Sequence, residues 1–237
     1  RLISAAFADV VCRTTAQVDW LMSHLLFETP YSETPYVLMS YDEDNLVANA
    51  GKLLTGDVEA LALLTRVSAI LGLGTSFTGT THCGSMAEHM ISHCIDMFAG
   101  TAHPGTSHGE QVGVATLTMS RLQNKLLLAD APPVLRPTVI PEAQLERRFG
   151  AETARTMIAQ TRLKALDAGA AQRINRRLAG DWPEFAGRLV SVMRPYGELH
   201  AAMRLAGCQL TAAELGLQPH FYQDVVRYAR FLRDRFT

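Results

Sequence analysis

The sequence has 237 residues, of which 48% are hydrophobic and 19% charged, and its formal net charge is −1. That composition is typical of a globular domain with a sizeable core, and the balanced charge excludes an electrostatic preference for nucleic acid. The four cysteines form no CxxC pair, so the reduced thiols of a cytoplasmic protein are expected. No apolar run approaches the roughly 18 residues of a membrane span, and no signal peptide is recognised.

Apolar residues recur on a helical period in the first part of the chain, from residue 4 to residue 27. Two prolines between 29 and 35 are expected to end that helix, because proline lacks a backbone donor and fixes φ. A shorter helix is predicted over 42–54, with Asp42 as its N-cap. Thr55-Gly56-Asp57 then combines a helix stop with a new cap.

The middle of the chain alternates apolar helices with polar loops. An apolar helix is predicted from residue 58 to about Leu71, where Gly72 and Gly74 are expected to end it. The next segment is rich in Gly, Ser and Thr and is predicted to be a loop. A second apolar helix over 85–98 carries apolar residues on most faces, which predicts a central, buried position.

The rest of the chain is also predicted to be helical. A long helix is expected over 108–128, and four prolines between 132 and 141 indicate an irregular connector before the final amphipathic helices. The sequence contains no convincing run of alternating strands and no internal repeat. We therefore predict one all-α domain over 1–237, with eight or nine helices and a possible subdivision near 130–141.

Four polar residues stand in an order that indicates a metal site. His89 and His93 are four residues apart in the apolar helix, so both imidazoles lie on one face, about one turn apart. His108 opens the next predicted helix, after a loop that lets the chain reverse. Asp9 lies in an apolar stretch, where a carboxylate needs a partner. Two neutral imidazoles and a carboxylate form a three-ligand site with an open position, which is typical of a catalytic divalent metal.

The segments around these residues are similar to a known family. "GSMAEHMISH" followed by "SHGEQVGVATL" resembles two signature segments of the superfamily that contains dehydroquinate synthase, glycerol dehydrogenase and sn-glycerol-1-phosphate dehydrogenase. "SAAFADVVCRTTAQVDW" resembles the segment that carries the acidic ligand, and "ARFLRDRFT" resembles a C-terminal signature. The resemblance runs from Ser4 to Thr237. Its tail and its "DW" pair favour the sn-glycerol-1-phosphate dehydrogenase family.

The resemblance implies the all-helical, C-terminal metal-binding domain of a dehydroquinate synthase-like fold. Asp9, His89 and His108 would be the metal ligands, and the metal would be zinc, nickel or iron. His93 would contact the substrate, and Asp9 would lie next to the substrate oxygen. The implied enzyme is a metal-dependent, NAD(P)-linked dehydrogenase of phospholipid biosynthesis. It would interconvert dihydroxyacetone phosphate and sn-glycerol 1-phosphate, and a homo-oligomer is possible.

No nicotinamide site is recognised in this sequence. Gly72-Leu73-Gly74 with Gly79 has the wrong spacing for the dinucleotide-binding GxGxxG motif, so no cofactor-binding residue is assigned. The sequence begins with Arg1 rather than Met. We expect that further residues precede it in the gene product and that the family's α/β dinucleotide domain is absent from this chain.

Two other functions stay open on these patterns. A carbocycle-forming lyase like dehydroquinate synthase uses the same constellation of ligands, and a truncated helical module would have no catalytic role. The intact set of candidate ligands argues against the second alternative. His82 and Cys83 replace the residues typical of the family before the Glu-His pair. They are interpreted as loop residues, or alternatively as ligands for a softer metal or determinants of substrate choice.

Overall fold

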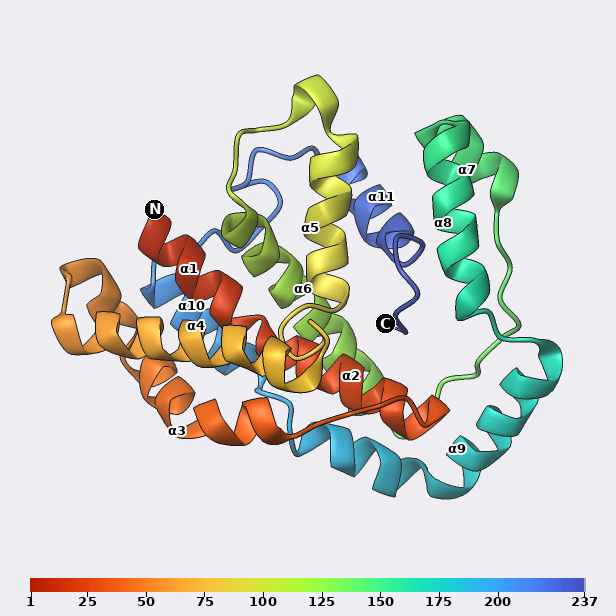
Figure 1. The fold of residues 1–237 in the computed structure, drawn as a ribbon, viewed down its shortest axis with the longest axis horizontal. Helices are drawn as coiled ribbons and strands as arrows, with labels where there is room; N and C mark the ends of the chain where they lie inside the picture. Colours follow the sequence, from red (N-terminus) through yellow and green to blue (C-terminus); the bar gives the residue numbers. More distant parts are fainter. Residues whose placement is uncertain (237) are drawn as a thin grey trace.

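A computed structural model describes residues 1–236 of the chain. Within that range it contains eleven α-helices, two short 3₁₀ helices and no strand (Figure 1). The predicted all-α class is confirmed. The predicted number of eight or nine helices is too low.

The first predicted helix, over 4–27, is two helices in the structure. α1 spans Leu2–Val11 and α2 spans Arg13–Phe27, and the two helices meet at Cys12, whose φ of −59° and ψ of −25° are still helical. Every residue from 10 to 21 is buried, so no exposed face repeats along this stretch. A hydrophobic period reports which face is buried, and it cannot register a break between two helices where all faces are buried.

The second predicted helix, over 42–54, is wrong in both extent and cap. α3 spans Thr34–Ala48, and a 3₁₀ helix, η1, spans Ala50–Thr55. Pro35, expected to break a helix, lies in the first turn of α3. There its missing N–H leaves no hydrogen bond unmade, and its fixed φ suits the helix.

The glycine and aspartate that follow do act as predicted. Gly56 has a φ of 75°, and the side chain of Asp57 accepts a hydrogen bond from the backbone N–H of Ala60 at 2.9 Å. They open α4, which spans Val58–Thr78 and ends at Gly79 in the left-handed region. The predicted end near Leu71 is therefore wrong.

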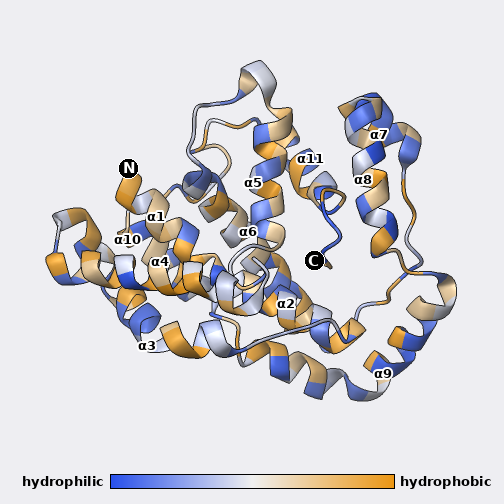
Figure 2. Cartoon of the chain, in the orientation of Figure 1, coloured by the Kyte–Doolittle hydropathy of each residue, from blue (hydrophilic) through white to orange (hydrophobic). Residues whose placement is uncertain are grey.

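Neither Gly72 nor Gly74 ends α4, and Gly74 serves packing. A Cβ at Gly74 would lie 2.9 Å from the Cβ of Pro35, so the glycine allows α4 to lie against the start of α3. The uninterrupted helix has 21 residues and is long and apolar enough, by length and composition alone, to cross a membrane. The expectation that no apolar run reaches that length is wrong, because the helix does not end near Leu71 as predicted. Only 22% of the apolar window of α4 is buried, and Figure 2 shows apolar residues along it.

Two helices form the centre of the molecule. α5 spans Ala87–Phe98 and packs along α6, which spans His108–Leu127, with the 3₁₀ helix η2 (Gly100–Ala102) in the loop between them (Figure 1). Both lie within two residues of the predicted bounds. The predicted central position of α5 is confirmed by its buried side chains, which include Met90, Ile91 and Ile95.

α1 crosses α6 with almost no space between the two backbones. A Cβ at Gly109 would overlap the backbone carbonyl oxygen of Ala5, and a Cβ at Gly113 would lie 2.8 Å from the Cβ of Ala8. These two glycines, one turn apart on α6, therefore permit the approach. The close contact places the next turn of α1, which carries Asp9, beside the first residue of α6.

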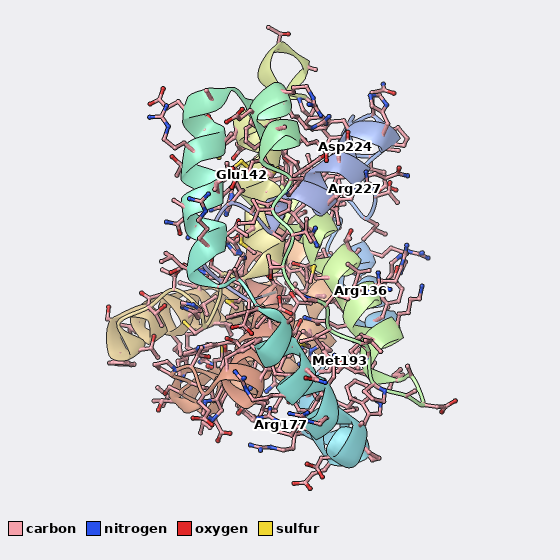
Figure 3. All side chains as sticks on the ribbon, turned by 90° about the vertical axis from the view of Figure 1, so that its right-hand side faces the viewer. Arg136, Glu142, Arg177, Met193, Asp224 and Arg227 are labelled. Carbon is pink, nitrogen blue, oxygen red and sulfur yellow. The ribbon has the colours of Figure 1, made fainter. Side chains whose placement is uncertain are left out.

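The remaining helices surround this centre. Their bounds are α7 Glu142–Phe149, α8 Ala151–Leu163, α9 Ala168–Val190, α10 Tyr196–Leu205 and α11 Pro219–Ala229. The predicted irregular connector before α7 is confirmed. Figure 3 views the side that carries it, with Arg136, Glu142 and Arg177 among the labelled polar side chains. A subdivision of the domain near 130–141 stays a prediction.

Candidate metal centre

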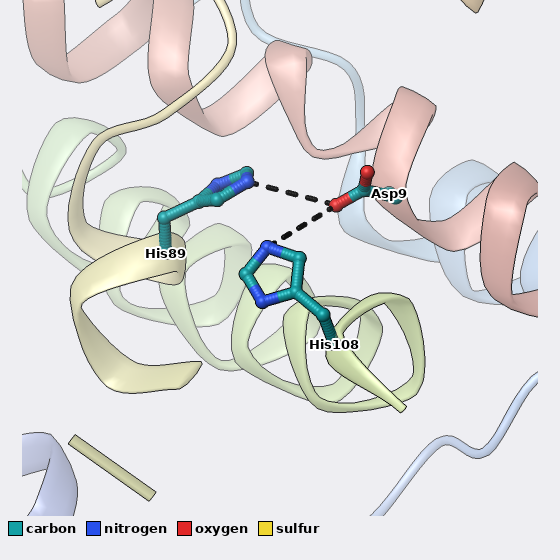
Figure 4. A group of neighbouring side chains, drawn as sticks. All are labelled: Asp9, His89 and His108. Atoms are coloured by element: carbon teal, nitrogen blue, oxygen red, sulfur yellow. Dashed lines mark ion pairs between the residues drawn. The ribbon is translucent and has the colours of Figure 1, made fainter. Parts of the chain in front are cut away.

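Three helices bring Asp9, His89 and His108 together (Figure 4). Asp9 lies near the end of α1, His89 in the first turn of α5, and His108 at the first position of α6. Asp9 Oδ1 is 3.6 Å from His89 Nε2 and 3.7 Å from His108 Nε2. The side chains that the sequence groups as candidate ligands thus lie close enough for one ion to contact all three.

Asp9 Oδ1 is a buried atom, and it has no hydrogen-bond partner among residues 1–236. A buried carboxylate oxygen without a donor is costly, because it has lost its water and gained nothing in exchange. This oxygen faces the Nε2 atoms of His89 and His108. A divalent cation at this point would satisfy the oxygen and use the lone pairs of both imidazoles.

The other nitrogen of His89 is held by a buried carboxylate. Glu88 has no exposed surface, and its Oε1 lies 3.0 Å from His89 Nδ1. The same carboxylate accepts the backbone N–H of Met86 at 2.7 Å and the hydroxyl of Thr15 at 3.3 Å. A carboxylate accepts only, so His89 keeps its proton on Nδ1 and its lone pair on Nε2. Glu88 is not among the site residues predicted from the sequence; its place directly before His89 was the available signal.

The other nitrogen of His108 contacts a hydroxyl. Its Nδ1 lies 3.0 Å from Ser92 Oγ, and the imidazole is less buried than that of His89, with 40% against 12% of the side chain exposed. Burial, followed by the nearby charge of His89, lowers the pKa of His108. Both effects favour the neutral imidazole, which is the form that binds a metal.

His93 lies beside the group. Its ring centroid is 6.4 Å from that of His89 and 5.5 Å from that of His108. Burial, with help from the positive charge of Arg233, lowers the pKa of His93 to about 4. His93 and Arg233 line a cavity of about 420 Å³, together with Asp96 and side chains of α8. His93 therefore faces space for a small molecule as a neutral group.

Two further sets of side chains could each supply three ligand atoms, and both share a histidine with the first. One set is Cys12, Glu88 and His89, and the other is His93, Asp96 and His108. Burial raises the pKa of the Cys12 thiol, so the protonated form is favoured and ligation is not. Asp9 with the two Nε2 atoms is the group with an orphaned oxygen at its centre.

His82 and Cys83 serve packing. The thiol of Cys83 is fully buried in a cluster with Trp20, Tyr36 and Met86. The His82 ring lies 5.8 Å from the Trp20 ring. Within residues 1–236, neither side chain belongs to a set that could hold a metal ion. The geometry fits the interpretation as loop residues.

No family model matches this sequence. Curated proteins named glycerol-1-phosphate dehydrogenase [NAD(P)+] do match. The protein of Natronomonas pharaonis is 34% identical over 125 residues, which are 52% of this chain and 34% of the relative. That of Methanothermobacter thermautotrophicus is 31% identical over 122 residues, 52% of this chain and 34% of the relative. That of Halorubrum lacusprofundi is 31% identical over 157 residues, 61% of this chain and 44% of the relative.

The helical fold and these matches define the class of protein as a helical domain related to dehydrogenases. More particularly, about half of the chain is similar, at 31–34% identity, to part of proteins named glycerol-1-phosphate dehydrogenase [NAD(P)+]. In the first two relatives the matched segment spans about a third of the relative's length. The activity, substrates and partners of a whole enzyme are accordingly treated as proposals below.

Proposed function

We propose that this chain is the metal- and substrate-binding domain of an NAD(P)-dependent dehydrogenase that interconverts dihydroxyacetone phosphate and sn-glycerol 1-phosphate. The observation that carries the proposal is the convergence of Asp9 Oδ1, His89 Nε2 and His108 Nε2 on one point. The names of the relatives give the reaction class and the cofactor.

Asp9, His89 and His108 would hold the divalent ion, and zinc, nickel and iron all suit two imidazoles and a carboxylate. Such an ion supplies positive charge beside the C2 oxygen of the substrate, where negative charge develops during hydride transfer. Asp9 is 44% exposed, so it also borders the space in which the substrate oxygen would lie. A nicotinamide cofactor would carry the hydride, and the residues of this chain would orient the substrate carbon that gives or accepts it.

His93 is proposed to contact the substrate directly. Its imidazole is neutral near pH 7 because its pKa lies at about 4. A neutral imidazole can accept a hydrogen bond from the C2 hydroxyl and hold that proton as hydride leaves. Arg233, on the wall of the same cavity, offers positive charge to the phosphate group. Together these groups fix the substrate at both of its polar ends.

We propose a cytoplasmic enzyme of phospholipid biosynthesis, with a small phosphorylated polyol or ketone as substrate and self-association as a further property. In this proposal α4 is a surface helix and not a membrane span. Its inner side chains Ala60, Leu64 and Val67 are buried in a core cluster with residues of α1 and α3, which supports that assignment.

The test is a product assay with the full-length enzyme. Dihydroxyacetone phosphate and NAD(P)H should yield sn-glycerol 1-phosphate, identified by stereospecific analysis, and removal of metal with a chelator should abolish turnover. Failure to oxidise NAD(P)H, or formation of a cyclic product, would replace the proposal with the lyase alternative or with a non-catalytic role.

A further inference from the structure

We infer that Asp96, Gln111 and Ser92 form a hydrogen-bonded relay that fixes the tautomer of His108, leaving the lone pair of its Nε2 free to face Asp9. These three are positioning residues, since they act on the site through one another. The inference deepens the proposed function, on which its metal-affinity readout rests. The tautomer itself does not depend on the reaction that the enzyme performs.

The relay begins at a carboxylate that receives two donors. Asp96 Oδ1 lies 2.8 Å from Gln111 Nε2 and 3.0 Å from His103 Nε2. His103 Nδ1 accepts the backbone N–H of Gly105 at 3.0 Å, so a neutral His103 carries its proton on Nε2 and donates it to Asp96. Because a carboxylate accepts only, the amide of Gln111 must turn its NH₂ group toward Asp96.

The orientation of Gln111 then decides the direction of the next bond. With its NH₂ group on Asp96, its Oε1 faces Ser92 Oγ at 2.8 Å and can only accept. Ser92 and Gln111 are both fully buried, so water does not compete for these bonds. A hydroxyl has one proton, and Ser92 uses it here.

The last bond of the relay joins Ser92 to His108. Ser92 Oγ has lone pairs left but no second proton, and it lies 3.0 Å from His108 Nδ1. The imidazole must therefore donate from Nδ1, which leaves Nε2 as a bare lone pair 3.7 Å from Asp9 Oδ1. Each bond in the series follows from the one before it.

The charge of Asp96 is what selects this direction. The backbone carbonyl of Thr106, 3.5 Å from Gln111 Nε2, weakly favours the same direction. Without these two acceptors, Ser92 and Gln111 would be equally satisfied with every bond reversed. In that arrangement the amide NH₂ would donate to Ser92, and Ser92 would donate to His108 Nδ1. The proton of His108 would then lie on Nε2, where it blocks metal binding. A carboxylate at Asp96 excludes that arrangement, because it would face the amide oxygen of Gln111.

Asp96→Asn tests the relay, because asparagine keeps the shape and can accept or donate. The tautomer of His108 is read from long-range ¹H–¹⁵N spectra of the metal-free, histidine-labelled enzyme, with the signal assigned by its loss in His108→Gln. Wild type should show the Nδ1–H form, and Asp96→Asn should show a mixture with Nε2–H. Zinc affinity, measured by competition with a chromophoric chelator, should fall by about 10–100-fold.

Glu152→Gln is the matched control, because it removes the same charge from the wall of the same cavity without touching the relay. It should leave the tautomer unchanged and zinc affinity nearly so. Ser92→Ala should mix the tautomers as Asp96→Asn does, and serves if that variant fails to fold.

An Nε2–H form in wild type, or an unmixed tautomer in both Asp96→Asn and Ser92→Ala, overturns the relay. Equal loss of zinc affinity in Asp96→Asn and Glu152→Gln also overturns it, in favour of a simple charge effect. The expected tautomer in an enzyme that does not act on dihydroxyacetone phosphate would support the relay and refute the proposed function.

Discussion

The two imidazoles of the candidate metal centre are oriented in different ways. His89 donates to Glu88, a carboxylate with no exposed surface that three groups of the protein contact. His108 contacts a neutral hydroxyl, and the nearest charge in its series of bonds is Asp96, whose side chain is 47% exposed. Both arrangements present Nε2 to Asp9. One side of the candidate site is thus fixed by the buried core, whereas the other is fixed by a carboxylate at the surface.

Removing either imidazole should have the largest effect and should abolish the difference between the two sides. His89→Ala and His108→Ala should each lose most of their bound metal. The loss of metal affinity should exceed the roughly 10–100-fold that is typical when a residue hydrogen-bonded to a ligand is changed. Elemental analysis of the purified variants gives the metal content, with His200→Ala as a control remote from the site. Full metal content in either ligand variant would show that its imidazole is no ligand.

His93 separates binding from chemistry, because it lies beside both imidazoles without facing Asp9 Oδ1. His93→Ala should retain the metal and lower turnover by about 10²–10⁴-fold, which is typical for loss of a general acid–base group. Steady-state assays on metal-loaded enzyme measure the change. Metal loss equal to that in His89→Ala would mean that the roles are divided wrongly.

Glu88→Gln sharpens the comparison with Asp96. Glutamine fits the same space but brings two protons where the site needs only acceptors, so one buried donor is left unsatisfied. We expect about 1–3 kcal/mol of lost stability in the metal-free protein, measured by urea unfolding, and weaker metal binding. Asp96→Asn, at the surface, should weaken metal binding with little loss of stability. Equal stability of the two variants would show that the two sides do not differ as described.

The smallest expected effect is a loss of folding stability at acidic pH. Burial, with the positive charge of Arg235 and Arg233, lowers the pKa of His82 to about 4. The unfolded chain therefore binds a proton below about pH 6.5 that the folded chain excludes, and stability should fall as the pH drops from 6.5 toward 4. His82→Gln should reduce this dependence, and the low pKa of His93 should leave part of it. Urea midpoints at pH 7 and pH 5 measure it, and an unchanged dependence would contradict the assignment.

The sequence predicts the fold class well and the helix ends less well. The bounds of α5 and α6 are predicted to within two residues, because polar loops flank the two helices. The start of α3 at Thr34 and the passage of α4 through Gly72 and Gly74 do not, because a proline or glycine reads as a helix stop unless the neighbouring helix is known. Gly74 is small because Pro35 packs against it, which is a contact between separate helices.

The candidate site is likewise predicted in part from the sequence and in part only from the contact between helices. The helical spacing and the family resemblance group Asp9, His89 and His108, and the structure brings them together; their role as ligands stays a prediction. Ser92 and Gln111 carry no recognisable motif, because their partnership exists only where α5 lies along α6. Donors and acceptors that meet across two helices leave no spacing rule in the chain.

The contact between α1 and α6 has a consequence for how this protein can change over evolutionary time. At Gly109 the two helices meet backbone to backbone. The distance between Asp9 and His108 is therefore set by contact between the two backbones. Substitutions among the surrounding apolar side chains would leave that distance unaltered. One added methyl group at residue 109 would separate the two helices and enlarge the site from behind. Gly109 thus sets the spacing of the candidate metal centre, although none of the candidate ligand atoms belongs to it.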